Sequence, residues 1–235
     1  MSVKTLIINN IPVAAEEGKT ILEAAKESGI HIPTLCYLEG VSPAAACRVC
    51  LVEIEGSNKL QPACVTQVTE GMVVQTDTPK LQTYRRMDIE LLFAEGNHIC
   101  AVCVANGNCE LQDLAVEVGM DHSRFPYRFP DRQVDVSHPQ FGIDHNRCIL
   151  CTRCVRVCDE IEGAHVWDVA NRGENCYIVS GLHQPWGEVD ACTSCGKCVD
   201  ACPTGSLFRK GTTTEEKTGD RAKLEFLVNA REKHE

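Results

Sequence analysis

The stretches that decide the fold of this chain are CILCTRCVRVC at residues 148–158 and CTSCGKCVDACP at residues 192–203. Both have the spacing Cys-x2-Cys-x2-Cys-x3-Cys, and a proline follows the last cysteine of the second run. Two-residue gaps let a tight loop wrap three thiolates around one cube, whereas the fourth cysteine lies one helical turn further on and points elsewhere. The repeated spacing is therefore typical of a bacterial ferredoxin fold with two [4Fe–4S] clusters.

In such a fold the first three cysteines of each run bind one cube, and the fourth binds the other cube. The expected ligand sets are Cys148, Cys151, Cys154 and Cys202 for one cube, and Cys192, Cys195, Cys198 and Cys158 for the other. Two disulfide-rich loops or two zinc sites are the alternatives. Zinc sites usually use paired Cys-x2-Cys units with a spacer, so this spacing favours the clusters.

A third cysteine set lies near the N-terminus and has the pattern Cys36-x10-Cys47-x2-Cys50-x13-Cys64. It departs from the plant-type ferredoxin spacing, whose first gap is four residues, but again one loop supplies most of the ligands. Small residues at 44–46 suit a loop folded closely over inorganic sulfides. We expect a [2Fe–2S] cluster on these four thiols, with a zinc site as the alternative.

A fourth set, His98-x-Cys100-x2-Cys103-x5-Cys109, offers three thiolates and one imidazole. Three cysteines alone would leave a cube one ligand short, and His98 lies close enough to complete it. We therefore expect a [4Fe–4S] cluster on this histidine–tricysteine set, with zinc on the same ligands as the competing metal. A neutral imidazole makes the cluster less negative than a fourth thiolate would, and so raises its reduction potential.

Cys176 is the cysteine left over from these sets, and it is expected to be a buried or free thiol. Three arginines, Arg147, Arg153 and Arg156, flank the first ferredoxin run. They could form a solvated basic face, or their charge could raise the potential of the nearby cube. The sequence does not separate these two interpretations.

The composition sets outer limits on function. The chain has 235 residues, 16 cysteines and a formal net charge of −10, which argues against nucleic-acid binding. Its first ten residues lack the apolar region of a signal peptide, and no run of 18 apolar residues predicts a transmembrane helix. The cysteines are expected to bind metal in a reducing compartment, the cytoplasm.

Hydrophobic patterning predicts an α+β chain. Expected strands cover residues 3–8, 11–14, 51–55, 59–65 and 72–75, with a helix opened by a capping box at Thr20 and closed by Gly29. Further helices are expected at 79–95, where Leu81, Tyr84, Met87 and Leu91 share one side, and at 110–118. The expected parts are a β-grasp [2Fe–2S] domain at 1–78, a histidine–tricysteine [4Fe–4S] domain at 79–122, a linker at 123–140, a two-cube ferredoxin domain at 141–210 and a C-terminal helical tail at 211–235.

The four ligand sets, in this order, resemble the N-terminal iron–sulfur region of the large peripheral-arm subunit of respiratory complex I. They also resemble the N-terminal domains of iron-only hydrogenases. The chain ends soon after the ferredoxin part, and with LLFAEGNH at 91–98 and SRFPYRFP at 123–130 it resembles the diaphorase small iron–sulfur subunit (the U subunit) of the bidirectional, NAD(P)-linked nickel–iron hydrogenase. Some members lack cysteines in the ferredoxin runs, whereas this sequence keeps all eight, as cyanobacterial-type members do.

This resemblance implies a subunit of a hydrogen:NAD(P)+ oxidoreductase that passes single electrons between a flavin-containing, NAD(P)H-binding diaphorase subunit and the hydrogenase small and large subunits. Ferredoxin is an additional candidate partner. The sequence contains neither G-x-G-x-x-G nor G-x-x-x-x-G-K-[ST], so no nucleotide loop is recognisable. We expect no catalytic residue in this chain, because splitting a hydride into single electrons requires a flavin on another chain.

Two other functions compete with this one. The same type of iron–sulfur subunit could belong to a formate dehydrogenase or to a complex I-like diaphorase. A redox sensor or a structural iron–sulfur module is the alternative from another class. A sensor usually needs one labile cluster and an output domain, so four complete ligand sets favour an electron carrier.

Overall fold

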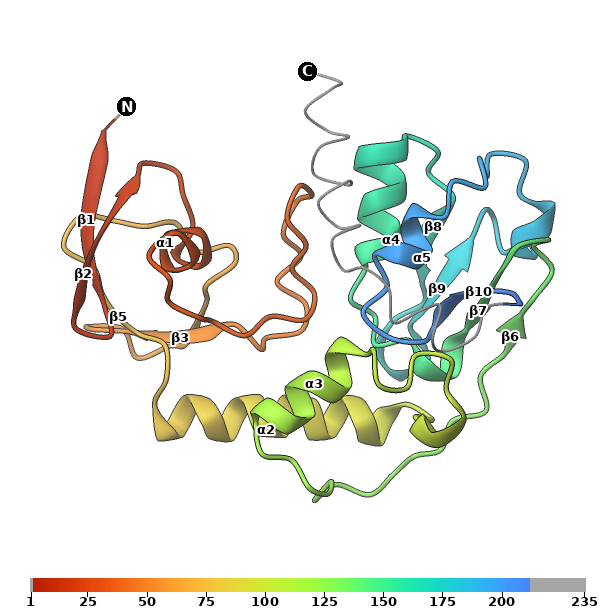
Figure 1. The fold of residues 1–235 in the computed structure, drawn as a ribbon, viewed down its shortest axis with the longest axis horizontal. Helices are drawn as coiled ribbons and strands as arrows, with labels where there is room; N and C mark the ends of the chain where they lie inside the picture. The colour runs from red at the N-terminus through yellow and green to blue at the C-terminus, as the bar shows by residue number, and fades with distance from the viewer. Residues whose placement is uncertain (1, 212–235) are drawn as a thin grey trace. The chain divides into compact units, whose positions relative to one another are not determined.

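The computed structural model describes residues 2–211, and their contacts group into two compact units (Figure 1). The first unit comprises Met1–Tyr37, Pro43–Leu91 and Leu114–His122. The second comprises Leu38–Ser42, Leu92–Asp113 and the chain from Ser123 onward. The helical tail expected at 211–235 falls, apart from its first residue, outside the described residues.

The first unit is built on a five-stranded sheet with the order β2-β1-β5-β3-β4. Strands β1 and β5 run parallel, and the other neighbours run antiparallel. The β1–β2 turn is made by Asn9 and Asn10, whose positive φ angles of 50° and 66° suit the tight turn of a hairpin. The strands are β1 (Val3–Ile8), β2 (Ile11–Glu16), β3 (Leu51–Ile54), β4 (Gln61–Pro62) and β5 (Val73–Gln75).

Helix α1 (Ile21–Glu27) packs against this sheet and begins at the predicted capping box. The Glu23 amide donates to the Thr20 hydroxyl, and the Thr20 amide donates to the Glu23 carboxylate, which satisfies two helix-terminal donors. Ile21, Ala24 and Ala25 are fully buried in the core that the helix shares with the sheet. The result is the helix-over-sheet arrangement of the expected β-grasp domain.

Helix α2 (Pro79–Glu95) has the predicted bounds, but its buried side differs from a simple apolar stripe. Tyr84 and Leu91 are about two-fifths exposed, whereas Leu81, Arg85 and Ile89 are buried. The Arg85 guanidinium donates to the carbonyl oxygens of Val49, Leu51 and Thr76. A buried arginine is tolerated here because backbone acceptors replace its water shell.

The second unit contains a three-stranded sheet, β10-β7-β6, and a separate hairpin of β8 and β9. Its strands are β6 (Val134–Asp135), β7 (Phe141–Asp144), β8 (Trp167–Ala170), β9 (Tyr177–Ser180) and β10 (Leu207–Arg209). Part of the expected linker at 123–140 thus forms an edge strand, β6, which pairs with β7.

Short helices connect these strands and follow the cysteine loops. Helix α4 (Arg153–Arg156) continues into a π-helical stretch, η3 (Val157–Glu162), and α5 (Lys197–Asp200) occupies the corresponding place in the second cysteine run. The others are η1 (Cys100–Val102), α3 (Glu110–Glu117), η2 (His145–Arg147), η4 (Gly173–Asn175) and η5 (Trp186–Glu188).

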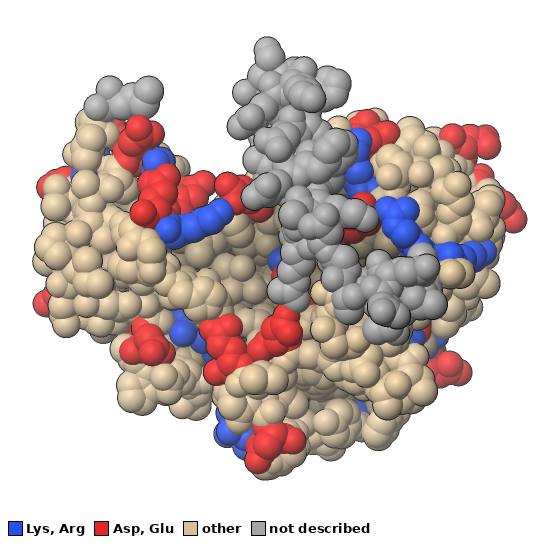
Figure 2. All heavy atoms as spheres, viewed as in Figure 1, with Lys and Arg blue, Asp and Glu red and all other residues tan. Residues whose placement is uncertain are grey.

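Charged side chains of both signs lie scattered over the face drawn in Figure 2, with Lys and Arg interspersed among Asp and Glu. This distribution agrees with the net acidic composition. Among the helices of residues 2–211, none is long and apolar enough to cross a bilayer.

Candidate metal centres

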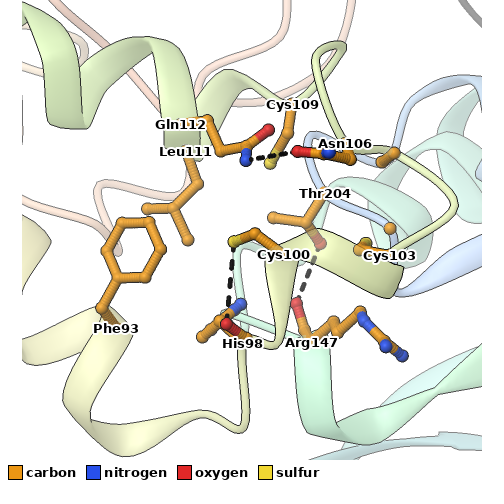
Figure 3. A pocket seen from close by; sticks show the side chains of 12 residues that line it. Phe93, His98, Cys100, Cys103, Asn106, Cys109, Leu111, Gln112, Arg147 and Thr204 are labelled. Carbon is orange, nitrogen blue, oxygen red and sulfur yellow. Dashed lines mark hydrogen bonds between the residues drawn. The ribbon is translucent and has the colours of Figure 1, made fainter.

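The four residues of the histidine–tricysteine set line one cavity in the second unit. Cys100 is the first residue of η1, His98 lies two residues before it, Cys103 follows η1, and Cys109 precedes α3 (Figure 3). Phe93 and Leu111 line the same cavity and make one side of it apolar. The structure therefore brings together the four residues that the sequence singled out.

The His98 side chain has the protonation and tautomer of a metal ligand. Its Nε2 atom is buried and has no hydrogen-bond partner, while the imidazole donates to the Leu92 carbonyl, which must involve Nδ1. Burial lowers the pKa of His98 to about 4, so the ring is neutral at physiological pH. A neutral imidazole with one nitrogen fixed and the other free is the form that binds metal.

Gly96 and Gly205 leave space for the side chains of His98 and Cys103. A Cβ atom on Gly96 would lie 2.3 Å from His98 Nε2, and a Cβ atom on Gly205 would lie 2.5 Å from Cys103 Sγ. Neither distance is compatible with an ordinary side chain. Gly205 lines the cavity beside Cys103, whereas Gly96 lies outside the cavity lining and leaves room for the His98 ring.

The four cysteines of the first predicted cube, Cys148, Cys151, Cys154 and Cys202, line a second cavity. Leu150 and Thr152 adopt positive φ angles of 53° and 58°, so the loop between the cysteines curls tightly. Burial raises the pKa of Cys148 to about 11 and that of Cys151 to about 12. The thiols are protonated without metal, so metal binding must release protons.

The four cysteines of the second predicted cube, Cys158, Cys192, Cys195 and Cys198, line a third cavity. Each run thus contributes three cysteines to one cavity and its fourth cysteine to the other. The Val166 amide donates to Cys158 Sγ over 3.3 Å. Cys195 is exposed, whereas Cys158 and Cys198 are buried.

The N-terminal cysteine set lies together in the first unit. The Cys36 amide donates to Cys47 Sγ over 3.3 Å, and the side chains of Cys50 and Cys64 are hydrogen-bonded to each other. A side-chain hydrogen bond with Cys36 and burial raise the pKa of Cys47, whereas the Cys36 amide lowers it; the side-chain bond with Cys64 and burial raise the pKa of Cys50. Ala45 has a positive φ of 50°, which lets the loop between Cys36 and Cys47 fold back over the thiols.

The arginines that flank the first ferredoxin run are not a solvated basic face. Only 4% of the Arg153 side chain is exposed, and it donates two hydrogen bonds to the Glu110 carboxylate. Arg156 is buried and donates to the carbonyl oxygens of Ser42 and Cys151. Arg147 forms an ion pair with Asp144. The interpretation as a solvated face is wrong for Arg153 and Arg156.

Several residues at these sites escaped sequence reasoning. Glu110 follows Cys109 directly, but nothing in its spacing connects it to Arg153. Trp186 donates its indole N–H to Cys192 Sγ over 3.3 Å, yet lies six residues away from that cysteine. Only composition could have drawn attention to Trp186, because it is one of just two tryptophans in the chain. Cys176 is half-buried and lines none of the three described cysteine cavities.

Three family models match consecutive parts of the chain. Residues 4–79 match a 2Fe-2S iron-sulfur cluster binding domain, and residues 85–124 match the NADH-ubiquinone oxidoreductase-G iron-sulfur binding region. Residues 139–208 match the ferredoxin-like domain of NADH-quinone oxidoreductase subunit 3. Together with the fold, they define an iron–sulfur protein of the class that contains the large iron–sulfur subunit of complex I and related hydrogenase subunits, and they confirm the expected α+β fold class.

Two individual relatives identify the family within this class. The chain is 35% identical over 224 residues to the gamma subunit of the NAD-reducing hydrogenase HoxS of Cupriavidus necator, covering 92% of this chain and 91% of that protein. It is 34% identical, with a TM-score of 0.85, to a chain in the crystal structure of an NAD+-reducing [NiFe]-hydrogenase in the H2-reduced state, covering 89% and 88% of the two chains. The chain belongs to the family of the HoxS gamma subunit, the iron–sulfur subunit of NAD-reducing [NiFe]-hydrogenases.

Two longer relatives match this chain over only part of their own length. The chain is 41% identical over 204 residues to a G-type subunit (G 2) of the NADH-quinone oxidoreductase of Rhizobium meliloti, but these residues are 23% of that protein. It is 39% identical over 218 residues to the HndD subunit of the NADP-reducing hydrogenase of Solidesulfovibrio fructosivorans, of which it spans 36%. The predicted relationship to complex I and to other hydrogenases is therefore confirmed.

Proposed function

We propose that this chain carries single electrons through one [2Fe–2S] and three [4Fe–4S] clusters, between a flavin subunit that reacts with NAD(P)H and the subunits of a [NiFe]-hydrogenase. The observation that carries the proposal is the grouping of the ligands. Each [4Fe–4S] ligand set lines a cavity of its own in the second unit. Clusters of this kind exchange one electron each when bound.

The proposed ligands are the residues already described. They are Cys36, Cys47, Cys50 and Cys64 for the [2Fe–2S] cluster; His98, Cys100, Cys103 and Cys109; Cys148, Cys151, Cys154 and Cys202; and Cys192, Cys195, Cys198 and Cys158 for the three cubes. Zinc would need its donors to converge on one point. Within residues 2–211, no group of three or more His, Cys, Asp or Glu side chains does so. In the three [4Fe–4S] sets the donors are spaced around a cavity, and this arrangement suits a cluster better.

The partners follow from what the sequence lacks and what its relatives assemble with. A hydride carries two electrons, which a flavin must pass on one at a time. This sequence has no recognisable nucleotide loop, so we place that flavin on another chain. The hydrogenase small and large subunits are the proposed partners on the other side, with ferredoxin as an additional candidate.

The hydrogenase assignment is supported by the HoxS gamma subunit and by the chain of the [NiFe]-hydrogenase structure, each of which matches this chain over most of its own length. The alignment covers 91% of the HoxS gamma subunit but 23% of the complex I relative. A complex I-like or formate-linked diaphorase remains the second candidate function, supported by the higher identity of 41%. Copurification of the tagged chain and identification of its partners decide between the two.

Reduction experiments test the electron-carrier function itself. Dithionite should reduce the purified chain and produce the EPR signals of reduced iron–sulfur centres, whereas NADH or NADPH alone should not. Adding the flavin subunit should make the nicotinamide an effective reductant, and adding the hydrogenase subunits should link that reduction to hydrogen. If flavin-free chain oxidises NADH as fast as the whole complex does, a catalytic site has been missed and the proposal is wrong.

A further inference from the structure

Both tryptophans of the chain line the same cavity, the one formed by Cys158, Cys192, Cys195 and Cys198. Trp167 is 4% exposed and Trp186 is 1% exposed. Their rings pack edge to face with centroids 4.7 Å apart. The two indoles therefore form one buried wall of this cavity.

Each indole also makes a hydrogen bond to a cysteine sulfur. The Nε1–H group of Trp186 donates to Cys192 Sγ over 3.3 Å. The side chain of Trp167 is hydrogen-bonded to the Cys198 sulfur. An indole can only donate, so both bonds place a partial positive charge against sulfur.

The surrounding side chains hold Trp186 in this position. Its ring lies against Phe141 and His138, with centroid distances of 5.5 Å and 4.8 Å. Its backbone amide donates to Asp135 Oδ2 over 2.7 Å. Trp167 is fixed differently, as the first residue of β8, whose strand pairs with β9. The donors therefore belong to a packed wall and need no rearrangement to reach the sulfurs.

Hydrogen bonds of this kind act on the redox equilibrium of a cluster. The sulfurs of a cluster carry negative charge, and this charge increases when the cluster gains one electron. A donor therefore stabilises the reduced state more than the oxidised state and raises the reduction potential. The effect is stronger where water is excluded, as it is beside these two buried rings.

We propose that Trp167 and Trp186 raise the reduction potential of the cube bound by Cys158, Cys192, Cys195 and Cys198, through their indole N–H groups. The inference rests on the proposed ligand set for this cube. It adds a tuning role for two residues that are not ligands themselves. Removing either donor should lower the potential of this cube and leave the other clusters unchanged.

Trp186→Phe is the direct test, because it keeps an aromatic ring in the wall and removes the N–H donor together with the five-membered ring of the indole. Redox titration of the full chain, followed by EPR, should show this cube about tenfold harder to reduce, which is about 59 mV for one electron. Tyr177→Phe is the matched control. Its hydroxyl is hydrogen-bonded to His183 and Tyr177 does not line the cavity, so the potential should stay the same.

If Trp186→Phe fails to bind the cube, a measurement on the unaltered sequence tests the inference instead. Chain labelled with 15N-indole tryptophan should show 15N coupling to the reduced cube in pulsed EPR, and Trp167→Phe should weaken that coupling. A cube that is present but shows neither 15N coupling nor a shifted potential overturns the inference. Absence of this cube from the unaltered chain would instead overturn the ligand assignment, and the inference with it.

Discussion

Arg153 donates two parallel hydrogen bonds, of 2.7 and 2.8 Å, to the carboxylate of Glu110. Arg153 precedes Cys154, and Glu110 follows Cys109, so the pair joins the segments that line two different cavities. The Glu110 amide also donates to the carbonyl of Pro203, the residue after Cys202. An ion pair between the buried Arg153 and the partly buried Glu110, together with one backbone hydrogen bond, thus links the two neighbouring sites.

Glu110→Gln should destabilise the chain strongly. It leaves the Arg153 charge buried without its counter-charge, and breaking a buried pair in this way costs about 3–5 kcal/mol. Anaerobic denaturant unfolding measures the change. Glu174→Gln is the control, because Glu174 pairs with Arg128 at the surface, where both side chains are about two-thirds exposed. It should cost less than about 1 kcal/mol. Equal effects of the two substitutions would show that the Arg153–Glu110 pair has no special importance.

Gly205→Ala should empty the histidine–tricysteine site. The new Cβ would lie 2.5 Å from Cys103 Sγ, so this sulfur must shift from the position it occupies beside Gly205. Iron analysis of anaerobically reconstituted protein should find about four irons fewer per chain. Val102→Ala changes a 73% exposed residue of the same loop and should retain the full iron content. A normal iron content in Gly205→Ala would show that Cys103 is not a ligand.

His98→Cys should keep a cube at this site but lower its reduction potential. The substitution adds a negatively charged ligand where the imidazole was neutral, and a shift of about 59 mV changes a one-electron equilibrium tenfold. Redox titration with EPR detection would follow the change. If every cluster signal keeps its potential, His98 does not bind the cluster.

Metal analysis should find about 14 irons in each fully reconstituted chain, from one [2Fe–2S] and three [4Fe–4S] clusters. Anaerobic iron and sulfide determination measures this content. Substantial zinc, or iron near half of that value, would contradict the ligand assignment. Removing the iron with a chelator should also destabilise the fold, because a cluster bound only by the folded chain stabilises it.

Asp88→Asn should stabilise the chain at neutral pH. Burial raises the pKa of Asp88 to about 6, against the smaller opposing effect of the Arg48 charge. The folded state then holds its proton more tightly than the unfolded state, so stability falls as the pH rises from about 4 to about 6. Above pH 6 the substitution should gain about 1–2 kcal/mol, after allowance for partial solvent screening, and nearly nothing at pH 4. Unfolding curves at both values measure this, and an equal gain at pH 4 would refute it.

Local signals explain why so much of the fold was predictable. The capping box at Thr20, the length of α2 and the spacing of the cysteine runs are properties of short stretches of sequence. The strand expected at 59–65 proved shorter, as β4 (Gln61–Pro62), because most of that segment forms turns around Cys64.

Contacts between distant residues explain what the sequence could not reveal. Gly205 matters because Cys103 lies against it, and Trp186 matters because its ring turns toward Cys192. Arg85 occupies a buried helix position because three carbonyl groups from other segments accept its hydrogen bonds. None of these partners is set by a periodic pattern, so only the folded chain identifies them.

The exchange of Cys158 and Cys202 between the two ferredoxin cavities has a consequence for biosynthesis. The set that ends at Cys64 and the set that ends at Cys109 are complete early in translation. Neither cube of the ferredoxin part has all its proposed ligands until the ribosome has passed the second run: one requires Cys198 and the other requires Cys202. A nascent chain arrested between the runs would expose four thiols of the first run with no complete site. With the proposed ligands, neither cube of this part can be fully bound before the whole segment from residue 148 to residue 202 has been made.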